Sequence, residues 1–390
     1  MHAEGAVLEV AVVGGGFAGL ITARTLAKRG FNVTLYEEHS RVGYPPHCTG
    51  LVSTRTVELI GDPAKESIEG VFDKVIFRAE GHELVIRVKG VARLDRVRLE
   101  NLLAEELRSY GVSLRFESPV TTLKHASDGV SLIVRGERRE YDYVVLAEGL
   151  HGNLRKLVGV VHEPLTSLGL NTDYKVDAIG DGIEVIINPE LHSVPYAWAF
   201  SLEGYTVVGA LGWKPGEVRQ AITSIASEKG LARSTRIYGG RVIHGPPLDP
   251  RKLPFNVGVV GDAAALNKPL TGGGLFPNAL LASKLDFKLS TGLDLNEAFL
   301  QAYKDVHRLL ARQYHLAKHL LDPAVLALLV RHASIAGLEV GVEDPVDYDD
   351  HRGLVRHVFK EQPFRTLKMG VRMLITNPLV TLKILAGALL

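Results

Sequence analysis

The stretch that decides the fold of this chain is Val10-Ala11-Val12-Val13-Gly14-Gly15-Gly16-Phe17-Ala18-Gly19. Residues 8–13 form an apolar, β-branched run that is typical of a strand buried on both faces. Gly14, Gly16 and Gly19 then supply the G-x-G-x-x-G spacing of a dinucleotide-binding turn. In such a turn the first glycine allows the tight bend, the second lets the backbone approach a pyrophosphate, and the third lets helix and strand pack closely. We therefore predict a strand, a phosphate-binding turn and a helix, in that order.

The next residues complete a nucleotide-binding unit. Residues 21–29 are predicted to form the helix, whose N-terminal N–H groups and dipole would face the phosphates. Residues 32–36 are predicted to form the second strand, which ends at Glu37. An acidic residue roughly 20 residues past the glycines hydrogen-bonds an adenosine ribose. Strand, helix, strand and acid in this order predict a Rossmann-like dinucleotide-binding fold.

The composition of the chain excludes several classes of function. The 390 residues are 46% apolar and carry a formal net charge of +1, so there is no basic surplus to indicate a nucleic-acid partner. Cys48 is the only cysteine, which excludes an internal disulfide and a cysteine-ligated iron–sulfur cluster. His315 and His319 are one helical turn apart but have no third ligand, so we predict no metal site. The chain starts without a signal-peptide pattern and has no apolar run of roughly 18 residues, so we expect a cytoplasmic protein.

A second glycine-containing motif lies far along the chain. Residues 257–260 form an apolar run that leads to Asp262, and the glycines at 272–274 open a predicted helix near Leu275. An aspartate at the end of a buried strand can accept hydrogen bonds from ribitol hydroxyls, and a helix N-terminus stabilises negative charge on a reduced flavin. A second G-x-G-x-x-G motif is absent, which favours one tightly held dinucleotide, FAD rather than NAD.

Between these motifs the pattern changes to alternating strands. Residues 72–77 and 83–88 predict a β-hairpin, and Asp95 is the predicted cap of an amphipathic helix. An antiparallel sheet is predicted from strands at 184–187, 196–200 and 205–211. Everything after Asp294 has a helical pattern, with breaks at prolines.

The predicted fold class is therefore α/β with mixed α+β character. It combines a Rossmann-like FAD-binding domain, an inserted antiparallel-sheet substrate domain and C-terminal helices. The predicted boundaries are 1–70, 95–160 and 250–290 for the FAD-binding domain, 71–94 and 161–249 for the substrate domain, and 291–390 for the C-terminal helical region.

These motifs, with Asp95-Arg96 and Ala147-Glu148-Gly149 between them, occur in the order found in p-hydroxybenzoate-hydroxylase-type flavoproteins. Within that group the chain resembles the geranylgeranyl reductase family. Cys48 lies in a Pro-Pro-His-Cys-Thr-Gly loop similar to the family's cysteine loop beside the flavin; from the residues alone, a small buried side chain is an equal alternative. The resemblance and the first motif together imply FAD contacts at Gly14, Gly16, Ala18, Gly19, Glu37, Cys48, Thr49, Leu51, Arg96, Val120, Asp262, Gly274 and Leu275.

The segment Pro195-Tyr196-Ala197-Trp198-Ala199-Phe200 resembles the family's prenyl-pocket segment. It departs from that pattern in the place of its first proline and in Ser201, which stands where the family has a second proline. Tyr196, Trp198 and Phe200 alternate along one strand, so their rings are predicted to share a face and to bind substrate. An ordinary aromatic strand is the alternative. The candidate catalytic residues are Cys48, Tyr196 and Trp198, with Cys48, Tyr196 or water as the proton donor.

The resemblance implies an FAD-dependent reductase that saturates the double bonds of geranylgeranyl lipids, as in archaeal-type membrane lipid biosynthesis. Ferredoxin or NAD(P)H would be the electron donor; Glu148 stands where oxygenase relatives carry an Asp-Gly pair tied to NADPH use, which argues against direct reduction by NADPH. Two other classes share the fold. One is an FAD monooxygenase of a hydrophobic or aromatic substrate, and the other is an electron-transfer flavoprotein that feeds quinone.

The C-terminal residues have a distinctive charge pattern. Residues 362–390 contain no acid, and the pattern predicts a basic amphipathic helix followed by a short apolar helix that begins at Pro378. Such a pair suits peripheral contact with a lipid surface. Packing on the protein's own core or on a partner subunit is the alternative. The basic positions are Arg365, Lys368 and Arg372, and the apolar ones are Leu367, Val371 and Leu374.

Overall fold

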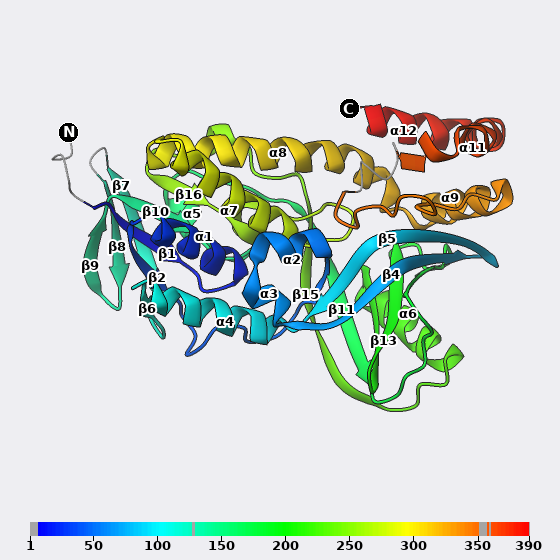
Figure 1. Cartoon of the computed structure of the whole chain (residues 1–390), viewed down its shortest axis with the longest axis horizontal. Helices are drawn as coiled ribbons and strands as arrows, with labels where there is room; N and C mark the ends of the chain where they lie inside the picture. Colours follow the sequence, from blue (N-terminus) through cyan, green and yellow to red (C-terminus); the bar gives the residue numbers. More distant parts are fainter. Residues whose placement is uncertain (1–6, 127–128, 351–356, 359, 390) are drawn as a thin grey trace.

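The structure is a computed structural model that describes residues 7–126, 129–350, 357–358 and 360–389. The predicted domain ranges that begin at residue 1 and end at residue 390 therefore include residues outside the described part. Figure 1 shows a nucleotide-binding layer and a second, larger sheet, with the long helix α8 (Leu295–Leu320) running from one toward the other. The predicted fold class is confirmed, whereas the exact domain boundaries stay a prediction.

The nucleotide-binding layer is an all-parallel sheet of five strands. Its central strand has no exposed apolar side chain between Val10 and Val13, as the β-branched run predicts, because it packs against helix α1 (Phe17–Lys28) and against strand β9 (Glu137–Tyr141) of a neighbouring antiparallel ribbon. The strand order is β16 (Val257–Val259), β10 (Tyr143–Leu146), β1 (Glu9–Val13), β2 (Asn32–Tyr36) and β6 (Ser113–Arg115).

Helices from distant parts of the chain pack on this sheet. α1 begins directly at the glycine turn, four residues earlier than predicted, and Asp95 caps α4 by accepting hydrogen bonds from the N–H groups of Val97 and Arg98. The helices of this part are α1 (Phe17–Lys28), α2 (Thr54–Ile60), α3 (Asp62–Lys65), α4 (Arg96–Ser109), α5 (Leu154–Leu157) and α7 (Leu275–Ser290). A three-stranded antiparallel ribbon adds β7 (Val120–Ala126), β8 (Gly129–Val134) and β9 (Glu137–Tyr141).

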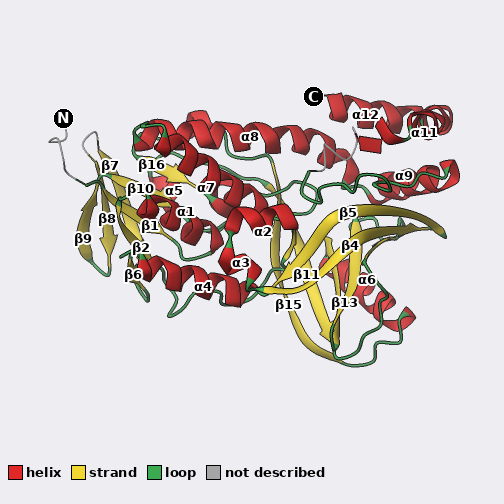
Figure 2. Cartoon of the chain, in the orientation of Figure 1, coloured by secondary structure: helices red, strands yellow, loops and turns green. Residues whose placement is uncertain are grey.

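The second sheet has eight strands, drawn in yellow in the lower right of Figure 2. The prediction of an antiparallel sheet is corrected at one place, because β12 (Ile183–Ile187) and β4 (Ile68–Ala79) pair in parallel. Strand β3 (Leu51–Ser53), which lies in the predicted FAD-binding segment, also joins the edge of this sheet by pairing with β5 (His82–Leu94). Helix α6 (Pro215–Glu228) packs on it, and the strand order is β15 (Ser234–Gly245), β11 (Leu165–Tyr174), β14 (Tyr205–Gly212), β13 (Tyr196–Leu202), β12 (Ile183–Ile187), β4 (Ile68–Ala79), β5 (His82–Leu94) and β3 (Leu51–Ser53).

The C-terminal region is not helical throughout, which corrects the prediction for residues 291–390. Helix α9 (Pro323–Ala336) ends at Gly337, whose φ of +67° gives the left-handed cap that glycine favours. Residues 338–350 then follow β5 as irregular backbone with bends and a turn, and form isolated bridges from Val340 to Ile86 and from Val346 to Val88. Burial of the valines against the sheet outweighs the helical pattern here. The chain ends in α11 (Pro363–Thr376) and α12 (Pro378–Leu389).

Candidate functional site

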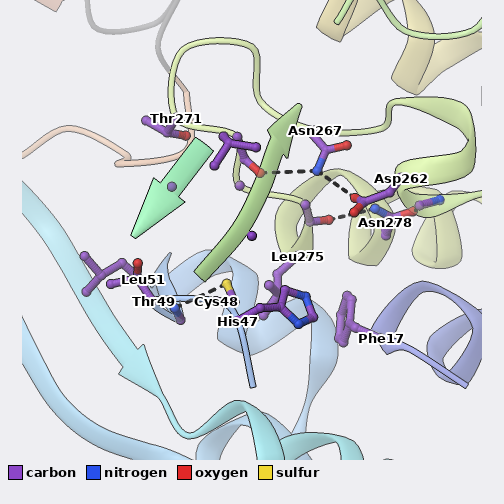
Figure 3. A pocket seen from close by; sticks show the side chains of 18 of the residues that line it. Phe17, His47, Cys48, Thr49, Leu51, Asp262, Asn267, Thr271, Leu275 and Asn278 are labelled. Atoms are coloured by element: carbon purple, nitrogen blue, oxygen red, sulfur yellow. Dashed lines mark hydrogen bonds between the residues drawn. The ribbon is translucent and has the colours of Figure 1, made fainter. Parts of the chain in front are cut away.

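A cavity of about 1240 Å³ lies between the nucleotide-binding layer and the eight-stranded sheet. It exceeds the roughly 300–1,000 Å³ of an ordinary small-molecule site. One part is lined by the glycine turn, the Cys48 loop and the loop before α7, and the other by apolar side chains of β4, β5, β12, α8 and α9. Figure 3 shows Cys48 and Thr49 lining this pocket together with Asp262, Asn267 and Asn278 from a distant segment.

The three motif glycines have different surroundings. Gly14 has a φ of +112°, and a Cβ atom there would lie 2.2 Å from the Ala147 carbonyl oxygen. A Cβ atom at Gly19 would lie 2.0 Å from the Gly14 oxygen, so helix and turn touch at this point. At Gly16 no atom lies within 4 Å of the Cβ position, and the residue faces the cavity. The fold therefore requires glycine at positions 14 and 19 for steric reasons, whereas Gly16 leaves open space above the start of α1.

Glu37 closes the end of β2 beside the glycine turn. One carboxylate oxygen accepts a hydrogen bond from the Gly15 N–H at 2.6 Å, and the other accepts from the His39 N–H at 2.8 Å. The His39 ring, which the sequence did not single out, lies 2.5 Å from the same oxygen through Nδ1. An ionised carboxylate has about four acceptor sites, so it can still accept a ribose hydroxyl.

The Cys48 loop meets the start of α4. The Arg96 guanidinium pairs with Glu100 and lies over the Phe17 ring, with 5.8 Å from its central carbon to the ring centre. Burial opposes the charge, but the Glu100 carboxylate and the Cys48 sulfur raise the pKa of Arg96 above its usual value. The cavity thus holds a fixed cation at the Cys48 thiol.

The loop before α7 supplies polar groups from the opposite segment. Asn267 donates from Nδ2 to the Asp262 carboxylate at 3.0 Å and to the Gly272 carbonyl at 3.2 Å. Helix α7 begins after Gly274 with no side-chain cap and no acid in its first turn. Its N–H groups are therefore available to an electronegative group.

These residues fit an FAD. The N-termini of α1 and α7, which face the cavity, lack a side-chain cap. Among the described residues, five buried polar atoms of cavity-lining side chains have no hydrogen-bond partner: Arg96 Nε, Asn267 Oδ1, Thr271 Oγ1, and Nε2 and Oε1 of Gln313. Buried polar atoms are normally paired, so these point to a polar ligand. The other predicted FAD contacts, Ala18, Thr49, Leu51, Val120 and Leu275, also line the cavity, whereas Gly19 does not.

The aromatic strand β13 forms part of the apolar wall. Tyr196 and Trp198 line the cavity, and their ring centres are 6.2 Å apart. The Tyr196 hydroxyl donates to the Leu270 carbonyl at 2.9 Å, and the Trp198 indole N–H donates to Asn171 at 3.1 Å. Phe200 is fully buried against Phe72 and is not among the cavity-lining residues, so the structure does not bring it to the cavity with Tyr196 and Trp198.

Two buried residues that the sequence did not identify lie behind the loop before α7. Lys268 pairs through Nζ with Asp349, and their side chains are 2% and 0% exposed. The other Asp349 oxygen accepts from the Ser53 N–H at 3.0 Å and from the Thr56 hydroxyl at 2.5 Å. Burial works against ionisation of Asp349, but Lys268 and the hydrogen bonds from Ser53 and Thr56 hold its pKa at about 2. No sequence signal links these residues, because they are far apart in the chain.

Within residues that the structure describes, no three His, Cys, Asp or Glu side chains gather as a metal-binding set. No single described helix is long and apolar enough to cross a membrane. α8 and α9 meet the criteria of length and composition only as a pair, across a bend of 89°.

Comparison with a protein family supports FAD as the cofactor. Residues 7–194 match the family described as FAD binding domain. The digeranylgeranylglycerophospholipid reductase of Methanococcus vannielii is 25% identical over 324 residues, which cover 76% of this chain and 81% of that protein. The reductase of the same name from Methanocaldococcus jannaschii is 24% identical over 386 residues, which cover 92% of this chain and 96% of that protein.

Solved structures share the fold. A geranylgeranyl bacteriochlorophyll reductase-like protein from Thermoplasma acidophilum superposes with a TM-score of 0.73 at 17% identity, over 93% of this chain and 98% of that one. The p-nitrophenol 4-monooxygenase of Pseudomonas putida gives a TM-score of 0.67 at 19% identity, over 84% of this chain and 94% of that one. Reductases and oxygenases therefore share this architecture, and the fold alone does not separate them.

Proposed function

We propose that this chain is an FAD-dependent reductase that saturates the carbon–carbon double bonds of geranylgeranyl lipids, because residues 7–194 match the FAD binding domain family and two proteins named digeranylgeranylglycerophospholipid reductase align with 76% and 92% of the chain. The observation that carries the proposal is the continuity of one cavity from the flavin-binding loops to a long apolar region. Burial of a hydrocarbon chain contributes about 0.8 kcal/mol per CH₂, so such a region favours a long prenyl chain over a small polar substrate.

We propose that the FAD is held at three places. The turn at Gly14 and Gly16, with the start of α1, would hold the pyrophosphate, and Glu37 the adenosine ribose. Asp262 and the start of α7 at Gly274 would hold the ribitol and the flavin ring. The bound, reduced flavin supplies two electrons as a hydride for the alkene.

The chain's own side chains then position the alkene. Tyr196 and Trp198 present rings whose orientations are fixed by hydrogen bonds to Leu270 and Asn171. Asn171 also accepts a hydrogen bond from Thr49 at 2.9 Å, which ties the aromatic wall to the Cys48 loop. A rigid wall of this kind holds a double bond at the roughly 3–3.5 Å that reaction requires and keeps water out.

Trp198→Ala is expected to lower the rate of double-bond saturation about a hundredfold with FAD content unchanged, because misplacing a substrate by about 1 Å can cost that much. The assay is mass spectrometry of a geranylgeranyl lipid after incubation with dithionite-reduced protein. Each saturated bond adds two hydrogens to the lipid mass.

Trp213→Ala is the matched control, because Trp213 is the other tryptophan and does not line the cavity. Ser201→Ala is a poorer control, since the Ser201 hydroxyl accepts hydrogen bonds from Ala178 and Ile179. Unchanged lipid masses with the wild-type protein, together with prompt hydroxylation of another compound, would assign the protein to the oxygenases instead.

Ferredoxin and NAD(P)H are the two electron donors that we propose. Glu148 accepts hydrogen bonds from the N–H groups of Leu154 and Arg155 at 2.7 and 2.9 Å, so this carboxylate caps α5. A residue engaged in this way supports ferredoxin over direct binding of NADPH. Anaerobic mixing of the oxidised protein with each donor, followed by loss of flavin absorbance, separates the two.

We also propose that α11 and α12 contact the membrane that contains the lipid. Both helices contribute to the cavity, through Thr366, Met369 and Gly387. Their outer surface carries Arg365, Lys368, Arg372 and Lys383, and it exposes the apolar side chains Phe364, Leu367, Val371, Leu374, Ile375, Leu379 and Leu382. Basic and apolar side chains together suit a surface of anionic lipid.

The triple variant Phe364→Ser, Ile375→Ser, Leu379→Ser is expected to bind anionic vesicles at least about tenfold more weakly, since each buried apolar side chain contributes roughly 1.5–3 kcal/mol. Vesicle sedimentation measures this, and truncation at Gln362 should weaken binding further. The control, Ile237→Ser with Phe255→Ser, removes side chains that are 68% and 63% exposed elsewhere. Equal binding by the triple variant and wild type would contradict membrane contact through these helices.

A further inference from the structure

Tyr348 lies where the apolar region of the cavity meets the loop before α7. It lies in a turn at the end of the 338–350 segment and lines the cavity. The Lys268 ammonium is 4.5 Å from the centre of its ring, and Asp349, the next residue, pairs with that ammonium. Cys48 and Tyr196 line the same cavity as Tyr348. One phenol thus shares the cavity with the Cys48 loop and the aromatic wall, and a buried cation lies over its ring.

Tyr196 and Cys48 are the other candidate proton donors that line the cavity, and both already contact neighbouring groups. The Tyr196 hydroxyl donates a hydrogen bond to the Leu270 carbonyl. The Cys48 sulfur accepts from the Gly50 N–H at 3.4 Å and lies beside Arg96. Among the described residues, none forms a hydrogen bond with the Tyr348 hydroxyl, so this proton is available to a group in the cavity.

We propose that Tyr348 is the proton donor of the reduction, an inference that rests on the proposed function. The proton leaves Tyr348 Oη for one alkene carbon, where the π electrons form the new C–H bond. The electrons of the broken O–H bond stay on Oη as a phenolate, and the other carbon takes the hydride that the reduced flavin supplies. Water entering the cavity after product release returns a proton to Oη.

The surroundings of Tyr348 favour the neutral phenol before the reaction and stabilise the phenolate after it. Burial raises the pKa of Tyr348 and keeps the phenol protonated before reaction, while the Lys268 ammonium acts in the opposite direction. Once the proton has left, the same ammonium stabilises the phenolate. Asp349 holds Lys268 in place, which is why a cation can remain in a site that is otherwise apolar.

The test is Tyr348→Phe, with Tyr110→Phe as the control because Tyr110 is an exposed residue at the end of α4. General acid catalysis contributes roughly 10²–10⁴-fold, so we expect a loss of that size in the single-turnover rate of the reduced protein with geranylgeraniol. FAD content, measured by absorbance, and geranylgeraniol binding to the oxidised protein, measured by the shift of the flavin spectrum, should stay at wild-type values.

The outcomes separate this inference from the proposed function. If wild type reduces geranylgeraniol and Tyr348→Phe does so equally fast, the inference is wrong and the proposed function stands. Parallel loss of FAD or geranylgeraniol binding would make Tyr348 a structural residue and also overturn the inference. If the wild type leaves geranylgeraniol unchanged, the proposed function and the inference fall together.

Discussion

Replacing Gly16 with leucine is expected to give a folded protein that purifies without FAD. The Cβ position of Gly16 has no atom within 4 Å and its φ is −73°, so a side chain fits the ligand-free fold without strain. The same side chain would fill the space above the start of α1 through which a pyrophosphate approaches the backbone. Overpacking costs about 1–3 kcal/mol and the N–H contacts are lost as well, so we expect FAD affinity to fall at least about a hundredfold.

Absorbance of the purified protein and titration with FAD measure this effect, and circular dichroism reports whether the fold is intact. Gly216→Leu is the matched control, because Gly216 also has open space around its Cβ position but lies in the first turn of α6, away from the cavity. Gly19→Leu should lose FAD through loss of the fold, since its Cβ atom would clash with the Gly14 oxygen. A yellow Gly16→Leu protein with wild-type FAD affinity would refute the placement of the pyrophosphate at this turn.

Asp349→Ala is expected to lower the free energy of unfolding by about 3–5 kcal/mol, the usual loss when one partner of a buried ion pair is removed. The change leaves Lys268 charged and unpaired in the interior and removes the acceptor of the Ser53 N–H and the Thr56 hydroxyl. Urea denaturation of the FAD-free protein measures the effect. Glu140→Ala is the control, because it breaks the exposed pair with Arg138, and such pairs contribute about 0–1 kcal/mol.

The difference in free energy of unfolding between wild type and Asp349→Ala should become smaller as the pH falls. The pKa of Asp349 is about 2 in the folded protein, below the roughly 3.9 of an unfolded aspartate. Its ionisation therefore stabilises the fold fully above about pH 4, and this contribution is lost as the pH falls toward 2. The free energies of unfolding of wild type and Asp349→Ala should therefore approach each other between about pH 4 and pH 2. The double variant Lys268→Met, Asp349→Leu should recover most of the lost stability, and equal losses for single and double variants would show that the pair is not the cause.

Much of the fold could be predicted because its signals are local. The run from Val10 to Val13, the glycine spacing and the acid at Glu37 specify a strand, turn, helix and second strand within a few dozen residues. The cap at Asp95 and the start of α12 at Pro378 are likewise set by neighbouring residues, and the structure confirms both. The helical prediction failed at residues 338–350, where pairing with β5 decides the conformation.

The sequence by itself determined the Rossmann-like unit, the FAD and the resemblance to prenyl-lipid reductases, because each depends on residue types at short spacing. Only the tertiary structure decided which of the aromatic side chains lines the cavity: Trp198 does, and Phe200 packs on Phe72 instead. It also decided that Lys268, Tyr348 and Asp349 meet, although no pattern along the chain relates them. The physical reason is that burial and ion pairing depend on distances in space, which are set by how the two sheets and the C-terminal segment pack together.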